Sequence, residues 1–591
     1  MEEEISMNVR FRGLFVLFVS IFFLQGDLVH ATSASFVPTV PTMAVRELAP
    51  GMRGKAYTVV SGTDVVSFPI SVVSVIPQDD RPSHLIVIKA EGPVIEATGG
   101  IAAGMSGSPV YVGDRLVGAI GYGWSFSDHT LGLVTPIEDM VQVFSWKDLS
   151  RPFVPEIAVS AVGASVRGGR TPQEKGALAL SGLSERARDR LSQALGLPVV
   201  LSGGTWMGAQ TVETKASLKP GDALGVMLVW GDVTLGATGT LSALSRDGRF
   251  LAFAHPFLGA GAVEFPVCRA WIHHVIPSIQ APFKIGSFGP IVGTLTQDRP
   301  QAVGGHLGRF APAMDLTLRL HDLDQGIWEV RNFRTVPDPF LVPKTIPKVF
   351  MGLVDRLWGR RGAGTAKMRV SFDGGGLRRK WSYTDYYFSP EDLTERLTKS
   401  VEDLVRLVPL NPFQTVLPLG VRFDLDMTAK PKILYADAIN LDKDMYNPGE
   451  TIQVSVDLRP YRGASQTKAF SVKVPEDTAG PCQVVVRGGG LGEPDGDEPG
   501  DVDRSISSLP ELFRELDDRE RNNEVIIELM YQKQGQEDME SELPPSAEFP
   551  GEIRRRKIKE GTMKVYRSEY YVEGSLQKTF IVLPKKQRDD L

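Results

Sequence analysis

The chain has 591 residues, 42% hydrophobic and 23% charged, which is typical of a globular protein and too long for one core, so two to four domains are expected. The net charge of −6 gives no basic field and argues against nucleic acid as the main partner. Sixty glycines and 41 prolines indicate many turns and hence a β-rich chain.

The chain begins with a segment of the secretory type. Positively charged residues precede an apolar run from Leu14 to Leu24, and Ala31 is a small residue suited to cleavage. This order predicts a signal peptide over residues 1–31 and an exported protein. The run is shorter than the ~18–20 residues that a membrane span needs. The alternative is a retained anchor, so a membrane partner is expected only if this segment stays uncleaved.

Short apolar runs alternate with turn signals over residues 36–145. Six of them are predicted to be strands: GKAYTVVSG, DVVSFPISVVSVI, HLIVIKAEG, SPVYVG, RLVGAIGYG and LGLVTPI. Because no long helical pattern interrupts them, these runs predict a β-barrel or a sandwich.

One stretch of this region, TGGIAAGMSGSP from Thr98 to Pro109, frames a serine with glycines. Ser106 lies between Gly104 and Gly107, which let the backbone turn sharply and a substrate carbonyl approach closely. Consecutive N–H groups in such a turn can point at one spot, as an oxyanion hole requires. The alternative is a glycine-rich turn whose serines only satisfy nearby backbone groups. A serine nucleophile also needs a base elsewhere in the chain.

Residues 146–197 are predicted to be a linker with one short helix, which starts at Ser184 and is ended by Gly196. A second β series follows over residues 198–320. It contains GATGTLSALSRDGRFLAFAHPF, with a hairpin turn between two strands at residues 245–248.

Among the histidines, His255 has the strongest position for a base. It follows the apolar strand RFLAFA where the chain must turn, so its ring is rigidly held yet open to a cleft. The remaining histidines are expected in the signal segment or in ordinary strand and loop contexts: His30, His84, His129, His273, His274, His306 and His321.

Residues 321–430 are predicted to form a β extension with one amphipathic helix. Ser389 has the residue type of an N-cap, Pro390 suits the first helical position, and Pro409 ends the apolar stripe. The stripe is expected to pack in a core.

Residues 431–591 are predicted to form a β-sandwich-like accessory domain with an acidic loop and a charged tail, because runs such as PGETIQVSVDLRPY alternate at period two. The acidic loop has a spacing that fits no EF-hand, so a solvated loop is expected there rather than a calcium site; its aspartates are Asp495, Asp497, Asp501 and Asp503.

No cofactor is expected from the motifs present. The sequence has no H-E-x-x-H, no P-loop and no G-x-G-x-x-G between a strand and a helix, so no metal, nucleotide or flavin is predicted. Cys268 and Cys482 lie far apart without metal-ligand spacing. A disulfide between them and a pair of buried free thiols both stay open.

The serine and histidine stretches resemble a known family. TGGIAAGMSGSP is similar to the nucleophile segment of SpoIVB-type serine peptidases and to the G-x-S-G-x-P loop of chymotrypsin-like peptidases. GATGTLSALSRDGRFLAFAHPF resembles the family's histidine segment, with Ala254 where a glycine would stand. The likeness covers roughly residues 45–145 and 215–310, without the family's PDZ-like insert, and the serine segment precedes the histidine segment, the reverse of the sporulation factor.

This resemblance implies a mainly β fold, in which a chymotrypsin-like double β-barrel peptidase unit precedes the sandwich domain. It also implies that Ser106 is the nucleophile and His255 the base, with the backbone N–H groups of Gly104 and Ser106 as oxyanion donors. Gly100, six residues before the nucleophile, would line the specificity pocket. A glycine there predicts a preference for small or apolar side chains.

The acid that would complete the triad stays open. Glu91 stands fifteen residues before Ser106, where the sporulation factor has an aspartate. Asp298 is the rival, because it follows His255 at a distance that suits a neighbouring strand of one barrel. The further alternatives are no third residue at all or one of three other aspartates, namely Asp222, Asp232 and Asp247.

Two functions of different classes are compatible with these features. The first is an exported serine endopeptidase in the periplasm or outside a bacterial cell, which cleaves an envelope protein or itself through an acyl-enzyme. Its partner would be a protein or peptide substrate in the cell envelope. The second is a catalytically silent envelope protein that uses the same fold for binding or scaffolding, because a fold alone does not establish activity.

Overall fold

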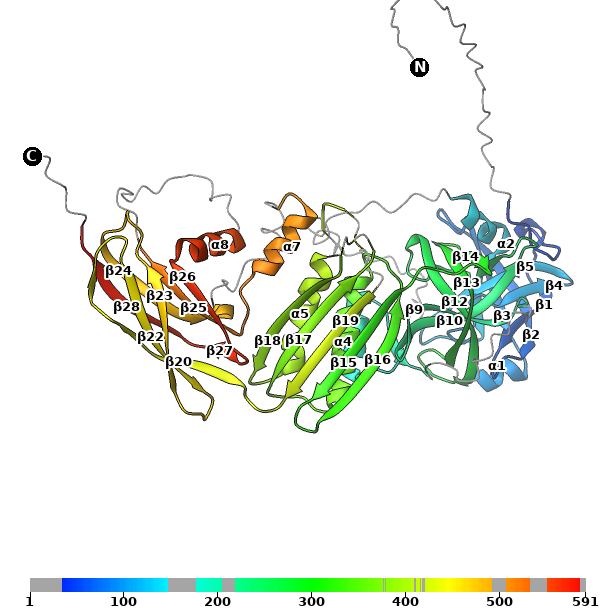
Figure 1. Ribbon diagram of the computed structural model, residues 1–591. Helices are drawn as coiled ribbons and strands as arrows, with labels where there is room; N and C mark the ends of the chain where they lie inside the picture. The colour runs from blue at the N-terminus through cyan, green and yellow to red at the C-terminus, as the bar shows by residue number, and fades with distance from the viewer. Residues whose placement is uncertain are drawn as a thin grey trace, which may run out of the picture. The chain divides into compact units, whose positions relative to one another are not determined.

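The computed structural model describes most of the chain after the first 34 residues (Figure 1). The described residues are 35–146, 177–202, 204, 218–375, 377, 379–408, 411–414, 416, 420–491, 506–531 and 550–584. The predicted signal peptide lies outside them, as do most of the predicted linker, the four aspartates of the acidic loop and most of the charged tail. No described helix is long and apolar enough to cross a bilayer.

The first part of the fold is a closed barrel of six strands in the order β1-β2-β3-β6-β5-β4. These strands are the six runs predicted from the sequence: β1 (Arg53–Val59), β2 (Val65–Pro77), β3 (His84–Ala90), β4 (Pro109–Val112), β5 (Arg115–Tyr122) and β6 (Leu131–Pro136). Helix α1 (Pro93–Thr98) follows β3, and α2 (Ile137–Met140) follows β6. Branched side chains such as Ile86, Ile88 and Val134 fill the interior.

A second ring of six strands lies within a thirteen-stranded sheet. Its members are β9 (Ala223–Gly231), β10 (Thr234–Leu244), β11 (Arg249–Ala252), β12 (Gly261–Ile276), β13 (Phe283–Arg299) and β14 (Ala302–Leu307). They run in the order β9-β12-β13-β14-β11-β10, and the additional pairing of β9 with β10 closes the ring. Numbered from its first strand, this ring has the same 1-2-3-6-5-4 order as the first barrel. The predicted double barrel is therefore present.

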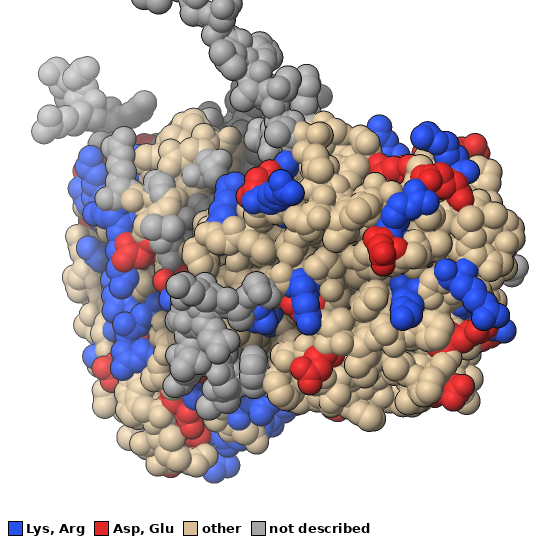
Figure 2. Space-filling view, turned by 90° about the vertical axis from the view of Figure 1, so that its right-hand side faces the viewer, with Lys and Arg blue, Asp and Glu red and all other residues tan. Residues whose placement is uncertain are grey.

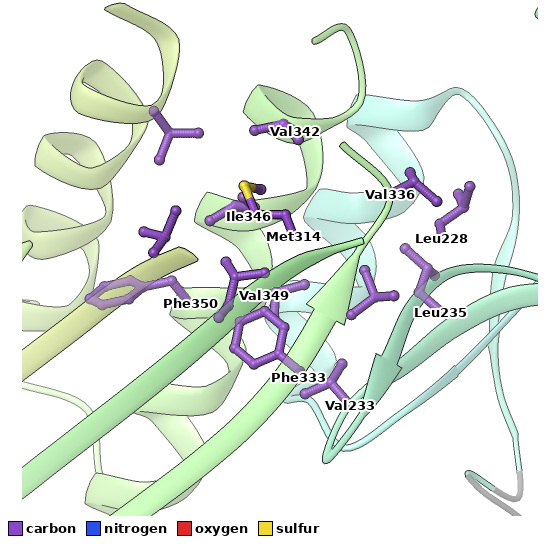
Figure 3. Close-up of a cluster of buried hydrophobic side chains, with 14 of the residues drawn as sticks. Leu228, Val233, Leu235, Met314, Phe333, Val336, Val342, Ile346, Val349 and Phe350 are labelled. Carbon is purple, nitrogen blue, oxygen red and sulfur yellow. The ribbon is translucent and has the colours of Figure 1, made fainter. Parts of the chain in front are cut away.

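The sheet continues beyond this ring on both sides. One end adds β7 (Leu178–Ser181) and β8 (Val199–Leu201), and the other adds β16 (Ile327–Thr335), β15 (Met314–Asp322), β19 (Gly420–Thr428), β17 (Gly364–Asp373) and β18 (Trp381–Ser389). Three helices pack beside one another against it: α3 (Glu185–Leu195), α4 (Val342–Trp358) and α5 (Leu393–Leu407). Figure 3 shows Ile346, Val349 and Phe350 of α4 beside Phe333 and Met314 of the sheet.

Two expectations for this part need correction. The stretch expected to hold one helix holds two, because the sequence reading missed α4 and its two prolines. Pro343 lies in the first turn, where an N–H partner is not needed, and the packing of neighbouring apolar residues offsets the hydrogen bond that Pro347 lacks. The N-cap of α5 is Asp392, whose carboxylate accepts from the N–H of Glu395, whereas Ser389 ends β18.

The last part is a β-sandwich, as predicted. One sheet has four strands in the order β23-β22-β20-β27 and the other has five in the order β21-β28-β24-β25-β26. The strands are β20 (Ile433–Leu441), β21 (Met445–Tyr446), β22 (Thr451–Pro460), β23 (Gln466–Lys473), β24 (Gly480–Gly488), β25 (Glu524–Met530), β26 (Met563–Arg567), β27 (Tyr571–Glu573) and β28 (Ser575–Val582). Helices α7 (Leu509–Asp518) and α8 (Pro550–Glu560) flank it.

Alternate residues of these strands point into a core shared by the two sheets, as Val454 and Val456 of β22 and Val484 and Val486 of β24 do. Cys268, in the second barrel, and Cys482, in the sandwich, are both free and buried, so the two thiols form no disulfide. On the face drawn in Figure 2, charged side chains of both signs are scattered among uncharged residues.

Candidate active site

Ser106 and His255 occupy equivalent places in the two barrels. Ser106 lies in the connection from the third to the fourth strand of the first barrel, between β3 and β4. His255 lies in the connection from the third to the fourth strand of the second barrel, between β11 and β12. We call residues 102–108 the nucleophile turn and residues 253–260 the histidine loop.

Hydrogen bonds between the barrels bring these two segments together. The backbone N–H of Thr240, in β10, donates to the carbonyl of Ser106 at 2.8 Å, and the carbonyl of Thr240 accepts from the N–H of Phe253 at 3.4 Å. On the other side, the hydroxyl of Thr135, in β6, donates to the carbonyl of Ala254 at 2.7 Å. Thr240 therefore bridges the nucleophile turn and the histidine loop. A strand of the second barrel binds the nucleophile turn of the first, and a strand of the first barrel binds the histidine loop of the second.

The nucleophile turn needs glycine for two reasons. Gly104 and Gly107 have φ angles of +92° and +91°, in the left-handed region that other residues rarely adopt. A Cβ atom on Gly107 would lie 2.0 Å from the carbonyl oxygen of Thr240 and 2.5 Å from the nitrogen of Phe253. The glycine frame thus lets the turn bend and lets the two barrels approach.

The backbone N–H groups of the turn divide into two sets. Those of Ala103, Met105, Gly107 and Ser108 each donate to a carbonyl, at 2.7 to 2.9 Å. Those of Gly104 and Ser106 donate to no acceptor within the described part of the chain. An oxyanion hole needs two such free N–H groups close together, here that of Ser106 itself and that of Gly104 two residues earlier. They are the two donors predicted from the sequence.

Two hydroxyl groups of β10 hold this turn and were not identified from the sequence. The hydroxyl of Thr240 donates to the carbonyl of Gly104 at 3.2 Å, and that of Ser242 donates to the carbonyl of Gly107 at 2.8 Å. Both side chains are fully buried. The signal for them was the alternation of Thr and Ser in GATGTLSALS, which is unusual for a strand facing a core.

The ring of His255 is buried and hydrogen-bonded through one of its two nitrogens. It is only 7% exposed and lies between Tyr122 of the first barrel and Phe253, with ring centroids 5.8 and 6.0 Å away. Its Nδ1 lies 2.7 Å from the carbonyl oxygen of Pro256. Because a carbonyl can only accept, Nδ1 carries the proton and Nε2 keeps its lone pair. Burial lowers the pKa of His255, which favours this neutral form.

Asp298 is buried beside the histidine loop. It is the last residue but one of β13, and its carboxylate accepts from the N–H groups of Phe257, Leu258 and Ala260 at 2.7, 2.8 and 2.9 Å. Burial raises the pKa of Asp298, while these three bonds and the nearby His255 oppose that rise. Asp298 therefore fixes the path of the loop that carries the histidine, rather than accepting directly from the ring.

The other acids considered from the sequence have different surroundings. Glu91 is exposed, and its carboxylate accepts no hydrogen bond from a described residue. Asp222 accepts from the N–H of Lys219, Asp232 from that of Asn332, and Asp247 pairs with Arg249. The structure thus gathers Ser106, His255 and Asp298 in one region and gives the other four acids no contact with the ring.

Gly100 has a φ angle of +114° and is pressed against His129, whose Cβ lies 2.3 Å from where a Cβ of Gly100 would stand.

The hydroxyl of Ser106 makes no hydrogen bond with any described residue, and neither does Nε2 of His255. Among the described residues, no hydrogen bond therefore joins the Ser106 hydroxyl to the His255 ring in this arrangement, and both groups are open to a substrate.

Comparison with known proteins adds one match. Residues 22–141 match the model of the family described as SpoIVB peptidase S55. The matched segment contains the first barrel and Ser106, and it ends before His255. Comparisons with curated proteins and with solved structures found no match. The first barrel and its serine turn are therefore similar to the SpoIVB-type serine peptidases.

Proposed function

We propose that the protein is an exported serine endopeptidase that works through an acyl-enzyme. The observation that carries the proposal is the pair of free N–H groups on Gly104 and Ser106, in a turn that the histidine loop approaches. Such a pair stabilises the charge of a tetrahedral intermediate and has no evident structural use. The family of residues 22–141 supports the same chemistry.

In the first half-reaction, Ser106 Oγ attacks the scissile carbonyl carbon while His255 Nε2 takes the hydroxyl proton. The N–H groups of Gly104 and Ser106 bind the resulting oxyanion. The tetrahedral intermediate then collapses, the C–N bond breaks, and the proton on Nε2 passes to the leaving amine. Water, deprotonated by the same imidazole, hydrolyses the acyl-enzyme. Asp298 serves this sequence as a positioning residue, because it fixes the loop behind the ring.

A fluorophosphonate probe tests the proposal because it reacts only with an activated serine. We expect the full-length protein to be labelled and Ser106→Ala to be unlabelled. We expect His255→Ala to label about 10²- to 10⁴-fold more slowly, the usual contribution of a general base. Ser108→Ala is the matched control, since this hydroxyl lies in the same turn but is fully buried, and it should label normally. A folded wild-type protein without labelling would instead support the silent binding or scaffolding function.

The substrate is proposed to be a protein of the bacterial envelope, or the chain itself, cleaved after a small or apolar side chain. The preference rests on the glycine at position 100 of the sequence pattern; His129 fills the space on the Cβ side of this residue. Sequencing the fragments of a random peptide library should show Ala, Val or similar residues before the cut. Cleavage confined to basic residues would contradict the assignment of Gly100. For export, the N-terminus of mature protein from an envelope fraction should lie just after residue 31.

A further inference from the structure

Lys284 is tied to the nucleophile turn by its backbone. It lies near the start of β13, and its N–H donates to the carbonyl of Ala103 at 2.9 Å. The N–H of Ala103 in turn donates to the carbonyl of Pro282 at 2.7 Å. These two bonds fix the segment immediately before Gly104 to the second barrel.

The side chain of Lys284 supports the turn as well. Its Cβ, Cγ and Cδ atoms lie 3.1 to 3.3 Å from where a Cβ of Gly104 would stand. The stem therefore fills the space that glycine leaves open, directly against the residue that supplies one of the two free N–H groups. A displacement of this stem would change the direction of that N–H.

The amine of Lys284 is buried without a counter-charge. The residue is 7% exposed, and its Nζ lies 2.8 Å from the hydroxyl of Thr58 in β1, its one hydrogen-bond partner among the described residues. Burial lowers the pKa of Lys284 to about 7. The amine can therefore change its charge near neutral pH.

Among the described residues, no acid contributes to the pKa shift of Lys284. On β1 the titratable neighbours of Thr58 in sequence are the exposed Lys55 and the half-buried Tyr57, and on β12 His273 and His274 are exposed. The nucleophile turn itself contains no titratable side chain. None of these groups shifts the pKa of Lys284, which responds to burial alone.

Protonation would disturb the turn for a simple reason. An ammonium group has three N–H donors, but only the hydroxyl of Thr58 faces it. A buried charge seeks further acceptors because an unpaired one is costly. The stem of Lys284 lies against Gly104, whose carbonyl already accepts from the hydroxyl of Thr240. A charged amine drawn towards further acceptors would move this stem and with it the peptide unit that carries the free N–H of Gly104.

We propose that Lys284 is a positioning residue of the nucleophile turn, which acts on Ser106 through Gly104 and permits reaction only while its amine is uncharged. The inference rests on the proposed peptidase function. It adds a residue of the second barrel that positions the oxyanion-binding N–H of Gly104. His255, from the same barrel, has the different role of transferring the proton.

The test is the rate of Ser106-dependent fluorophosphonate labelling of the full-length protein between pH 5 and 9. We expect the wild-type rate to rise with pH through two ionisations, those of His255 and Lys284. Lys284→Met keeps an unbranched apolar stem but removes the amine. Because no amine is left to become charged, this variant should keep the plateau rate and shift the midpoint of the profile to the lower pH of His255 alone. Lys89→Met, at an exposed lysine of the first barrel, is the control and should keep the wild-type profile.

Variants of Thr58 provide a second test if Lys284→Met does not fold. Thr58→Val has nearly the same shape and removes the amine's partner, so the midpoint should move to lower pH, whereas Thr58→Ser should keep it. A wild-type profile in both Lys284→Met and Thr58→Val would overturn the role of Lys284 while leaving the peptidase intact. Absence of labelling in the wild type at every pH would instead refute the proposed function itself.

Discussion

The carboxylate of Asp298 fixes the backbone conformation of the histidine loop. Asp298 accepts three backbone N–H groups within the four residues 257–260, and it does so from a buried position. Hydrogen bonds to a charged acceptor are stronger than those between neutral groups. The backbone just after His255 is therefore held in one conformation, and this fixes the position of the imidazole ring.

We expect Asp298→Asn to weaken this support. A carboxamide oxygen can accept at most two of the three N–H groups, and its NH₂ group would face donors instead of acceptors. Labelling should slow by about 10- to 100-fold, and the free energy of unfolding should fall by about 1–3 kcal/mol, the cost of unsatisfied buried donors. Stopped-time labelling and thermal unfolding measure the two effects.

Asp232→Asn is the matched control, because Asp232 also accepts from a backbone N–H, that of Asn332, but at an exposed position. It should change neither quantity by more than about 0.5 kcal/mol or its equivalent in rate. Equal effects of the two substitutions would contradict the organising role of Asp298.

At this scale the sequence predicted residues that belong to local motifs. Ser106, Gly104 and His255 were predicted because glycine frames and strand ends have recognisable patterns. Thr240 and Lys284 were not, because each meets the nucleophile turn from more than a hundred residues away. Asp298 was only one candidate among several, since its partners are backbone groups whose direction no sequence pattern reveals.

At the scale of elements, the nucleophile turn and β10 are in close contact across the two barrels. Gly107 has the carbonyl of Thr240 where its Cβ would be. Gly113, in the turn between β4 and β5, also has a positive φ, of +61°, but nothing lies within 4 Å of its Cβ position. The two glycines therefore separate the cost of the backbone conformation from the cost of the contact.

We expect Gly113→Ala to lower the free energy of unfolding by about 1–2 kcal/mol, the cost of a left-handed residue with a side chain, and to leave labelling unchanged. Gly107→Ala pays the same cost and must also push β10 away from the turn. Labelling should therefore be lost in Gly107→Ala even where circular dichroism shows both variants folded. Equal labelling rates in the two variants would show that the close contact is not needed.

The strands were easier to predict than the helices. All six strands of the first barrel follow the alternation and turn signals of the sequence, because each is a short run with clear ends. Helix α4 was missed because Pro343 and Pro347 look like helix breakers. The start of α5 was misplaced because Ser389, Pro390 and Asp392 are all residue types that are common at the start of a helix. Only the observation that β18 extends to Ser389 shows that the helix begins after Asp392.

At the scale of the whole described chain, the sandwich is joined to the long sheet through buried polar contacts. The carboxylate of Asp385, in β18, accepts from the backbone N–H of Asn522 at 2.8 Å and from its side-chain amide at 3.2 Å. Nearby, the indole of Trp381 donates to Asp517 at 2.8 Å. Burial raises the pKa of Asp385 to about 6.

This raised pKa predicts a pH dependence of stability. The folded state binds the Asp385 proton more tightly than the unfolded state, whose pKa is about 3.9, so unfolding releases a proton between these values. The contribution of Asp385 should therefore fall by about 3 kcal/mol as the pH rises from 4 to 6 and stay level above that. Asp385→Asn removes this ionisation. The wild-type midpoint of thermal unfolding should decline relative to that of Asp385→Asn over this range. If the midpoints of wild type and Asp385→Asn changed with pH in parallel, the raised pKa of Asp385 would be contradicted.

The long-range pairings of the fold were beyond the sequence. Alternation predicted a β-barrel or a sandwich early in the chain and a sandwich at its end, and the family resemblance implied the double barrel; the structure has two barrels and a sandwich. Nothing local indicated that β9 pairs with β10 to close the second ring, or that β15 pairs in parallel with β19 to extend the sheet past it. Such pairings join segments that are far apart in the chain, and the hydrophobic pattern within each strand does not indicate its partner.

The shared strand order of the two barrels has a consequence for control of the chemistry. In the proposed peptidase, corresponding connections of the two similar halves would supply the attacking oxygen and the acceptor of its proton, so neither half could react alone. The hydrogen bonds that β10 and β6 make across the two barrels would then set the alignment on which the reaction depends.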